Sequence, residues 1–144
     1  MIIRQGSPDD CVKIFELETR AFPSTPWSFD MVNEELKLKF DRKTWVVEKD
    51  DFILGYCMVR YGPGEAHLIN MAVDSRFQKR GVGSTLLQNF LKDISPKTSV
   101  FLEVKQSNFP AINLYKKHDF IEVGLRKKYY SDGENAIVML WIKD

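Results

Sequence analysis

The apolar residues of this chain fall into short runs that are separated by charged and turn-forming residues. Seven runs are rich in β-branched and aromatic residues, a composition that is typical of strands. Turn residues such as Lys49-Asp50-Asp51 and Gly62-Pro63-Gly64 separate several of these runs. The predicted strands cover Ile2–Arg4, Thr44–Glu48, Phe52–Val59, Leu68–Val73, Ser99–Val104, Phe120–Gly124 and Ala136–Trp141.

Four other segments have helical spacing and recognisable start signals. Ser7 and Pro8 begin the first helix, which the segment Phe22–Trp27 breaks. Ser28 begins a second helix that runs to about Leu36. A third helix starts at Ser84 and ends before Ser95-Pro96, and a fourth, capped by Asn108, reaches about Lys117. The strands and helices do not strictly alternate, which predicts a mixed α/β (α+β) fold.

Length and charge limit the classes of protein to consider. With 144 residues and no repeat, low-complexity segment or linker, we expect one domain over residues 1–144. The net charge of +1, from 21 basic and 20 acidic residues, gives no general attraction to nucleic acid or to an anionic membrane. Any anion site must therefore be a local cluster of charge.

No apolar run is long enough to cross a membrane, and the first residues lack the long apolar run of a signal peptide. We therefore expect a cytoplasmic protein. Cys11 and Cys57 lie far apart without the spacing of metal ligands, and the chain has only two histidines. No metal site is expected.

The segment Gln78–Ser84 carries the strongest chemical signal. It places two glycines and the cations Lys79 and Arg80 between a predicted strand and a predicted helix. Glycine allows close approach of the backbone, and the free N–H groups of a helix N-terminus bind anions. Such a glycine pair can equally serve only a tight turn, and the spacing alone does not decide between the two. The neighbouring cations Arg76, Lys79 and Arg80 favour a polyphosphate ligand.

Two further residues stand out from their surroundings. Glu103 interrupts the apolar run Val100–Val104, where glutamate is unusual. It is either the partner of a basic side chain or a general base. Tyr115 shares a helix face with Ala111, Leu114 and His118, where a core tyrosine is the plain interpretation.

Phe22–Trp27 contains two prolines and two aromatic residues between two helices. The prolines restrict the backbone of this segment, so its aromatic side chains can form the wall of a pocket. The alternative is a helix–helix connection in which Trp27 packs on the core.

Together these segments resemble the GNAT acetyltransferase superfamily. Its acetyl-CoA motif, Q/R-x-x-G-x-G/A, is matched by Gln78, Gly81 and Gly83. The resemblance covers essentially the whole chain and narrows to the ribosomal-protein-alanine N-acetyltransferase type. The segments that carry it are Ala21–Ser28, Asn70–Asp74, Leu102–Asn108, Leu114-Tyr115 and Lys128–Tyr130.

The resemblance implies a twisted mixed sheet of about seven strands with about four helices, in which two central strands splay apart. It implies acetyl-CoA as co-substrate, Glu103 as general base and Tyr115 as general acid. The acceptor would contact Phe22, Trp27, Tyr129 and Tyr130. The residues implied for acetyl-CoA are Met71, Ala72, Val73, Lys79, Arg80, Gly81, Val82, Gly83, Ser84 and Asn108.

The implied reaction is direct acetyl transfer to a protein N-terminus, with a ribosomal protein that starts with alanine as the expected partner. We expect a monomer or weak dimer that binds neither nucleic acid nor membrane. Two alternatives stay open: an acetyltransferase of a small amine, such as an aminosugar or polyamine, and a non-catalytic acyl-CoA-binding module. One position departs from the family, because Asp119 stands where glycine usually precedes the phenylalanine.

Overall fold

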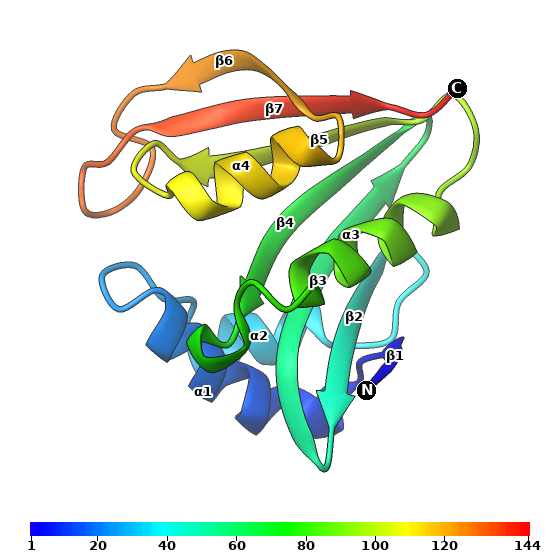
Figure 1. Ribbon diagram of the computed structural model, residues 1–144, viewed down its shortest axis with the longest axis vertical. Helices are drawn as coiled ribbons and strands as arrows, with labels where there is room; N and C mark the ends of the chain where they lie inside the picture. Colours follow the sequence, from blue (N-terminus) through cyan, green and yellow to red (C-terminus); the bar gives the residue numbers. More distant parts are fainter.

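One mixed β-sheet organises the computed structural model, which describes residues 1–144 (Figure 1). Only β4 and β5 are parallel; every other neighbouring pair is antiparallel. The strands lie in the order β1-β2-β3-β4-β5-β7-β6. They are β1 (Ile2–Gln5), β2 (Arg42–Lys49), β3 (Phe52–Gly62), β4 (Glu65–Val73), β5 (Ser99–Lys105), β6 (Ile121–Arg126) and β7 (Ala136–Ile142).

The two central strands part halfway along their length. β4 and β5 are paired only from Glu65↔Ser99 to Leu68↔Leu102. Beyond Leu68, β4 keeps its partner β3 but has no strand on its other side, and Figure 1 shows β4 and β5 diverging from that point. The splayed central strands expected from the family resemblance are confirmed.

A β-bulge lies at the point of divergence. Met58 pairs with Asn70 and Val59 with Leu68, so Ile69 is an extra residue in β4. A bulge bends its strand and re-aims the neighbouring side chains. Here it changes the direction of β4 just before the unpaired segment.

Helices cover both faces of the sheet, and the alternation of strand side chains determines which. On one face, α1 (Cys11–Ala21) and α2 (Phe29–Glu35) pack on residues such as Tyr56 and Met58. On the other, α3 (Val82–Asp93) and α4 (Phe109–Lys117) pack on their strand neighbours Cys57 and Val59. Two short 3₁₀ turns, η1 (Pro8–Asp10) and η2 (Ser75–Phe77), precede α1 and α3. No helix has both the length and the apolar character needed to span a membrane.

The predicted elements are all present, with shifted ends. The Ser28 hydroxyl accepts a hydrogen bond from the Met31 N–H (3.1 Å), and Asn108 Oδ1 accepts one from Ala111 N–H (3.3 Å), as their predicted capping roles require. The segment after Ser7 forms a 3₁₀ turn, rather than the first turn of α1 itself. β4 begins at Glu65, three residues earlier than predicted, because the Gly62–Gly64 turn forms a tight hairpin with β3.

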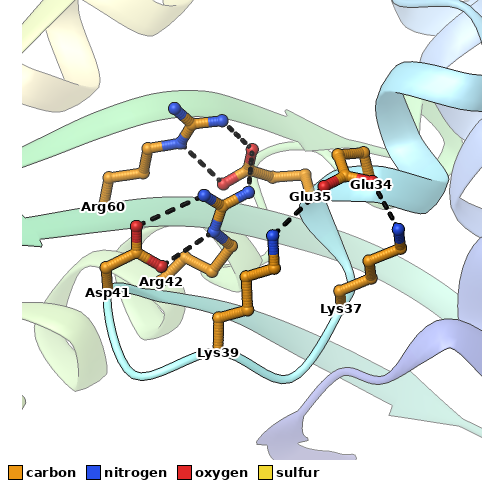
Figure 2. A network of polar contacts seen from close by, with 7 residues as sticks. All are labelled: Glu34, Glu35, Lys37, Lys39, Asp41, Arg42 and Arg60. Atoms are coloured by element: carbon orange, nitrogen blue, oxygen red, sulfur yellow. Dashed lines mark hydrogen bonds and ion pairs between the residues drawn. The ribbon is translucent and has the colours of Figure 1, made fainter.

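A buried ionic network fixes the end of α2 to the sheet (Figure 2). Glu35 is 3% exposed and accepts two hydrogen bonds from the Arg60 guanidinium, at 2.6 and 3.1 Å. Arg42 lies 3.7 Å from the same carboxylate and also pairs with Asp41. A buried carboxylate is tolerated when it is paired in this way. The network holds the C-terminal end of α2 against β2 and β3.

The end of α4 explains why aspartate is accepted at position 119. Asp119 has φ +70°, the left-handed conformation that usually selects glycine. Its N–H donates to the Lys116 carbonyl, and the Phe120 N–H donates to the Tyr115 carbonyl, at 3.1 and 3.0 Å. These two bonds form a Schellman motif. The rings of Tyr115 and Phe120 pack against each other, with their centroids 5.8 Å apart. The expected turn is therefore formed without the family glycine.

Candidate active site

A cavity lies where β4 and β5 part. Its walls come from five segments that are distant in sequence: α1 with the α1–α2 loop, β4, β5, α4 and the β6–β7 loop. Both faces of the sheet contribute, because Glu18 belongs to α1 and Tyr115 to α4. The lining residues are Glu18, Phe22, Thr25, Trp27, Leu68, Ile69, Asn70, Met71, Glu103, Val104, Lys105, Asn108, Ala111, Tyr115 and Tyr130.

Glu103 lies between this cavity and a second hollow that contains His67 and Arg126. One carboxylate oxygen is 2.5 Å from His67 Nε2, and the other is 3.5 Å from Arg126 Nε. The hydrogen bond with His67, together with the charges of His67 and Arg126, lowers the pKa of Glu103. The ion pair considered in the sequence is present, and it leaves the carboxylate at the cavity wall.

His67 is a site residue that the sequence analysis missed. A signal existed, since His67 pairs with Phe101 in the parallel register and Glu103 is two residues further along β5. Side chains two residues apart on a strand share a face, so the imidazole and the carboxylate are diagonal neighbours. Predicting the contact required the register of β4 and β5.

Tyr115 lies on the inner face of α4 and is 6% exposed. Its hydroxyl has no hydrogen-bond partner in the protein and is not among the fully enclosed polar atoms, so it opens to the cavity. Burial raises the pKa of Tyr115 above its usual value, which keeps the hydroxyl protonated. The arrangement offers a proton donor to a ligand in the cavity.

The predicted anion site has the backbone geometry that such a site requires. Gly81 caps α3 with φ +83°, and the first helical hydrogen bond runs from Thr85 N–H to the Gly81 carbonyl. The N–H groups of residues 82–84 therefore have no backbone acceptor. Lys79 and Arg80 are exposed and have no carboxylate partner. These free donors and cations fit an anionic phosphate group.

Arg76 was expected to join these two cations in favouring a phosphate ligand, but it is paired with a carboxylate instead. It lies 2.8 Å from Asp74, whose pKa this contact lowers to about 2. The Asp74 carboxylate also accepts a hydrogen bond from the Arg76 N–H, which fixes the 3₁₀ turn η2 before the loop. Arg76 thus shapes the loop, while Lys79 and Arg80 stay free for a ligand.

Contacts with α4 and β4 position the start of α3. A Cβ on Gly83 would lie 2.7 Å from Leu114 Cδ2 and 3.4 Å from Met71 Cε, so glycine allows the close approach. His118 Nε2 lies 2.9 Å from the Ser84 hydroxyl, a contact that the sequence did not indicate.

Ala72 points its side chain into the α1–α2 core, which leaves only its backbone for a ligand. Met71 lines the cavity directly.

Three of the four predicted acceptor residues line the cavity: Phe22, Trp27 and Tyr130. Tyr129 does not. It is 49% exposed and packs edge-on against Tyr130, with ring centroids 5.1 Å apart. Asn108, predicted for the cofactor, also lines the cavity while it caps α4.

Glu18 is a second residue that the sequence analysis missed. It is 1% exposed, and its carboxylate accepts hydrogen bonds from Asn70 Nδ2 (2.7 Å), Trp27 N–H (2.9 Å) and the Tyr56 hydroxyl. A signal was available in the spacing, because Glu18 occupies the apolar face of α1 with Cys11, Ile14 and Leu17.

Residues 11–120 match the acetyltransferase (GNAT) family. The chain belongs to this family. An N-alpha-acetyltransferase from Sulfolobus acidocaldarius is 37% identical, over 95% of this chain and 89% of its own length. A [ribosomal protein bS18]-alanine N-acetyltransferase from Salmonella typhimurium is 33% identical, over 92% of this chain and 91% of its own length.

Solved structures agree with this membership. The ribosomal-protein-S18-alanine N-acetyltransferase of Escherichia coli superposes with a TM-score of 0.89 at 27% identity, covering 99% of this chain and 94% of that one. NAA60 of Arabidopsis thaliana, solved in complex with acetyl-CoA, gives a TM-score of 0.84 at 19% identity, covering 98% and 97%. The second similarity concerns the fold alone. The seven-stranded GNAT architecture is thus confirmed for this acetyltransferase.

Proposed function

We propose that this acetyltransferase transfers the acetyl group of acetyl-CoA to the α-amine of a protein N-terminus. One observation carries the proposal: the cavity between the parted strands is lined by a carboxylate, Glu103, and an unpartnered hydroxyl, Tyr115. A base and an acid are the two groups that an amine acceptor and a thiol leaving group need. The N-alpha-acetyltransferase relative and the alanine N-acetyltransferase relatives support the same reaction.

The donor would bind along the parted strands. The free N–H groups at the start of α3, with Lys79 and Arg80, fit its pyrophosphate. The unpaired edge of β4 at Met71–Val73 offers backbone groups to the pantetheine arm, and Asn108 stands beside this edge in the cavity wall. Acetyl-CoA supplies the activated acetyl group, and the chain supplies the binding and proton-transfer groups.

Glu103 is the proposed general base, acting directly or through one water molecule. Its lowered pKa keeps the carboxylate ionised throughout the neutral range, so it is always ready to accept a proton. The side chain of His67 is 42% exposed, and its contact with Glu103 gives the proton a path toward solvent. Tyr115 is the proposed acid that protonates the departing thiolate.

The energetics favour an N-terminal amine over a lysine side chain. The reference pKa of an α-amine is about 7.7–8.0 and that of lysine about 10.4, so neutralising the lysine costs roughly 3.5 kcal/mol more. A single carboxylate base can remove the proton from an α-amine more easily than from a lysine side chain, because the α-amine is the weaker base. The cavity wall is also suited to a cationic amine, because it holds Glu18 and Glu103 while Lys105 is paired with Asp132 at 2.9 Å.

The proposed acceptor is a ribosomal protein that begins with alanine, modified in the cytoplasm by a monomer or weak dimer. The names of the bacterial relatives support this acceptor. Phe22, Trp27 and Tyr130 would form the wall along which the first residues of the peptide lie, with Tyr129 supporting Tyr130.

A side-by-side assay tests the proposal. The protein is incubated with acetyl-CoA and either alanine-starting peptides or small amines, including an aminosugar and a polyamine, and the products are identified by mass spectrometry. The expected result is acetylation of the peptides only. Acetylation of small amines alone would replace the proposed acceptor. Binding of acetyl-CoA with no transfer to any amine would indicate a non-catalytic module.

A further inference from the structure

We propose that Glu18 is a positioning residue that orients the side-chain amide of Asn70 so that its carbonyl oxygen faces the entering acceptor amine. This inference rests on the proposed function, because it assigns a role at the acceptor side of the same cavity. It concerns a glutamate and an asparagine that are 52 residues apart in sequence and meet at the β4 bulge.

Glu18 is a buried carboxylate with only neutral partners. It is 1% exposed, and its three hydrogen-bond donors are an amide, a phenol and a backbone N–H. No lysine, arginine or histidine forms an ion pair with it, unlike the buried Glu35, which pairs with Arg60 and Arg42. Three donors from three different elements converge on this one buried side chain, so its hydrogen bonds, and not an ion pair, define what it does.

The contact with Glu18 determines which way the Asn70 amide points. A carboxylate accepts hydrogen bonds and cannot donate them, so only the NH₂ end of Asn70 can face it, here at 2.7 Å. The other end, Oδ1, has no partner in the protein and is not enclosed. Asn70 lines the cavity, so its open acceptor belongs to the cavity wall.

The Glu18 carboxylate also fixes the α1–α2 loop. Glu18 Oε2 accepts the Trp27 N–H at 2.9 Å, while Oε1 accepts the Asn70 amide. Trp27 and Asn70 therefore have a common anchor on α1, and both line the cavity. An acceptor amine, which presents only N–H donors when protonated, would meet the Asn70 carbonyl oxygen beside the Trp27 wall.

Glu18→Gln tests this role because, at nearly constant shape, it reverses the polarity of the two contacts that Glu18 Oε1 makes with Asn70 and Tyr56. The carbonyl of the introduced glutamine can still accept the Trp27 N–H, and its NH₂ can donate to the Tyr56 oxygen. The second N–H of the glutamine NH₂ group then points at Asn70 and needs an acceptor there. The Asn70 amide must therefore turn over, which places its own NH₂ group, instead of its carbonyl oxygen, at the cavity wall. We expect the KM for an alanine-starting peptide to rise about tenfold or more, the effect of one lost hydrogen bond to a charged group. The KM for acetyl-CoA should stay within about twofold.

The double variant Glu18→Gln/Asn70→Asp supplies the rescue. The introduced aspartate has two acceptor oxygens, so one can take the N–H of the introduced glutamine and the other can face the acceptor. The peptide KM should return to within about threefold of the wild type. Glu35→Gln is the control for the loss of a buried carboxylate that does not line the cavity; it should lower the melting temperature without changing the peptide KM.

Two results would overturn the inference. One is an unchanged peptide KM in Glu18→Gln. The other is a parallel loss of melting temperature and of both KM values that the double variant does not restore, which would indicate a purely structural glutamate. Failure of the proposed function gives a different result, because the wild type itself would then not acetylate the peptide.

Discussion

At the scale of single residues, Glu103 forms the ion pair that its sequence context suggested and still lies where the proposed general base is needed. It forms an ion pair with His67 and Arg126, and it also lines the cavity with Tyr115. The ion pair lowers its pKa, so the carboxylate stays ionised at any pH at which an α-amine begins to lose its proton. The pH dependence of the reaction should therefore follow the protonation state of the acceptor amine and not that of Glu103.

Glu103→Gln should reduce kcat/KM for a peptide by about 10²-fold or more near neutral pH. The loss should be larger at about pH 6.5 than at about pH 9, because the α-amine, with a reference pKa of about 7.7–8.0, is mostly neutral at the higher pH. The pH–rate profile of the two proteins checks this. Glu65→Gln, which removes a carboxylate from the neighbouring hollow, is the control and should follow the wild-type profile. Parallel profiles for Glu103→Gln and the wild type would remove Glu103 as the base.

Tyr115→Phe should lower kcat by about 10²-fold or more while the affinity for acetyl-CoA stays nearly constant. The hydroxyl has no partner in the protein, so its removal leaves no protein group unpaired. Its raised pKa makes proton donation to a thiolate uphill, but a positioned acid still lowers the barrier. Steady-state kinetics and a cofactor-binding measurement separate the two effects. Tyr61→Phe controls for the loss of a phenol outside the cavity, and near-normal turnover in Tyr115→Phe would exclude it as the acid.

At the scale of elements, the loop before α3 depends on the conformation of Gly81. Its φ of +83° costs an ordinary residue about 1–2 kcal/mol, and a Cβ there would meet no atom within 4 Å. Gly64 has the same properties, with φ +72° and open space, but lies in the β3–β4 turn. Gly81→Ala and Gly64→Ala should therefore lose similar stability. Only Gly81→Ala should weaken acetyl-CoA binding, and equal binding by both variants would contradict the anion site.

The C-terminal end of α4 gives a prediction of the opposite sign. Asp119→Gly should stabilise the protein by up to about 1 kcal/mol, because glycine adopts φ +70° without the steric cost of a Cβ. For a chain of this size, that corresponds to a rise in melting temperature of about 2–4 °C. Thermal unfolding measures it. An unchanged or lower melting temperature would show that the Asp119 carboxylate compensates for its backbone strain.

The elements that the sequence predicted correctly are those with local causes. Ser28 and Asn108 form the predicted caps through bonds to residues three positions away. The pairs that were missed depend on strand register and on the packing of distant segments. Glu18 reaches Asn70 only because α1 lies under the β4 bulge, and His67 reaches Glu103 only in the parallel register. The parting of β4 and β5 came from family resemblance, since no local pattern marks where two strands separate.

At the scale of the whole molecule, the parted strands allow groups from both faces of the sheet to meet. Tyr115 belongs to a helix on one face and Glu18 to a helix on the other, yet both line one cavity. The proposed donor site at the start of α3 adjoins Met71, and Met71 lines the same cavity as Phe22 and Trp27 of the proposed acceptor wall. Direct transfer from donor to acceptor needs this arrangement, and neither Cys11 nor Cys57 lines the cavity as a covalent relay would require.

The most direct test of the account uses one peptide that carries both a free N-terminal alanine and an internal lysine. The peptide is incubated with acetyl-CoA and the protein, and fragment mass spectrometry locates the acetyl group. We predict acetylation of the α-amine alone, in a reaction that Tyr115→Phe slows by about 10²-fold or more. Acetylation of the lysine in preference to the N-terminus, or of neither amine while a small amine is modified, would contradict it.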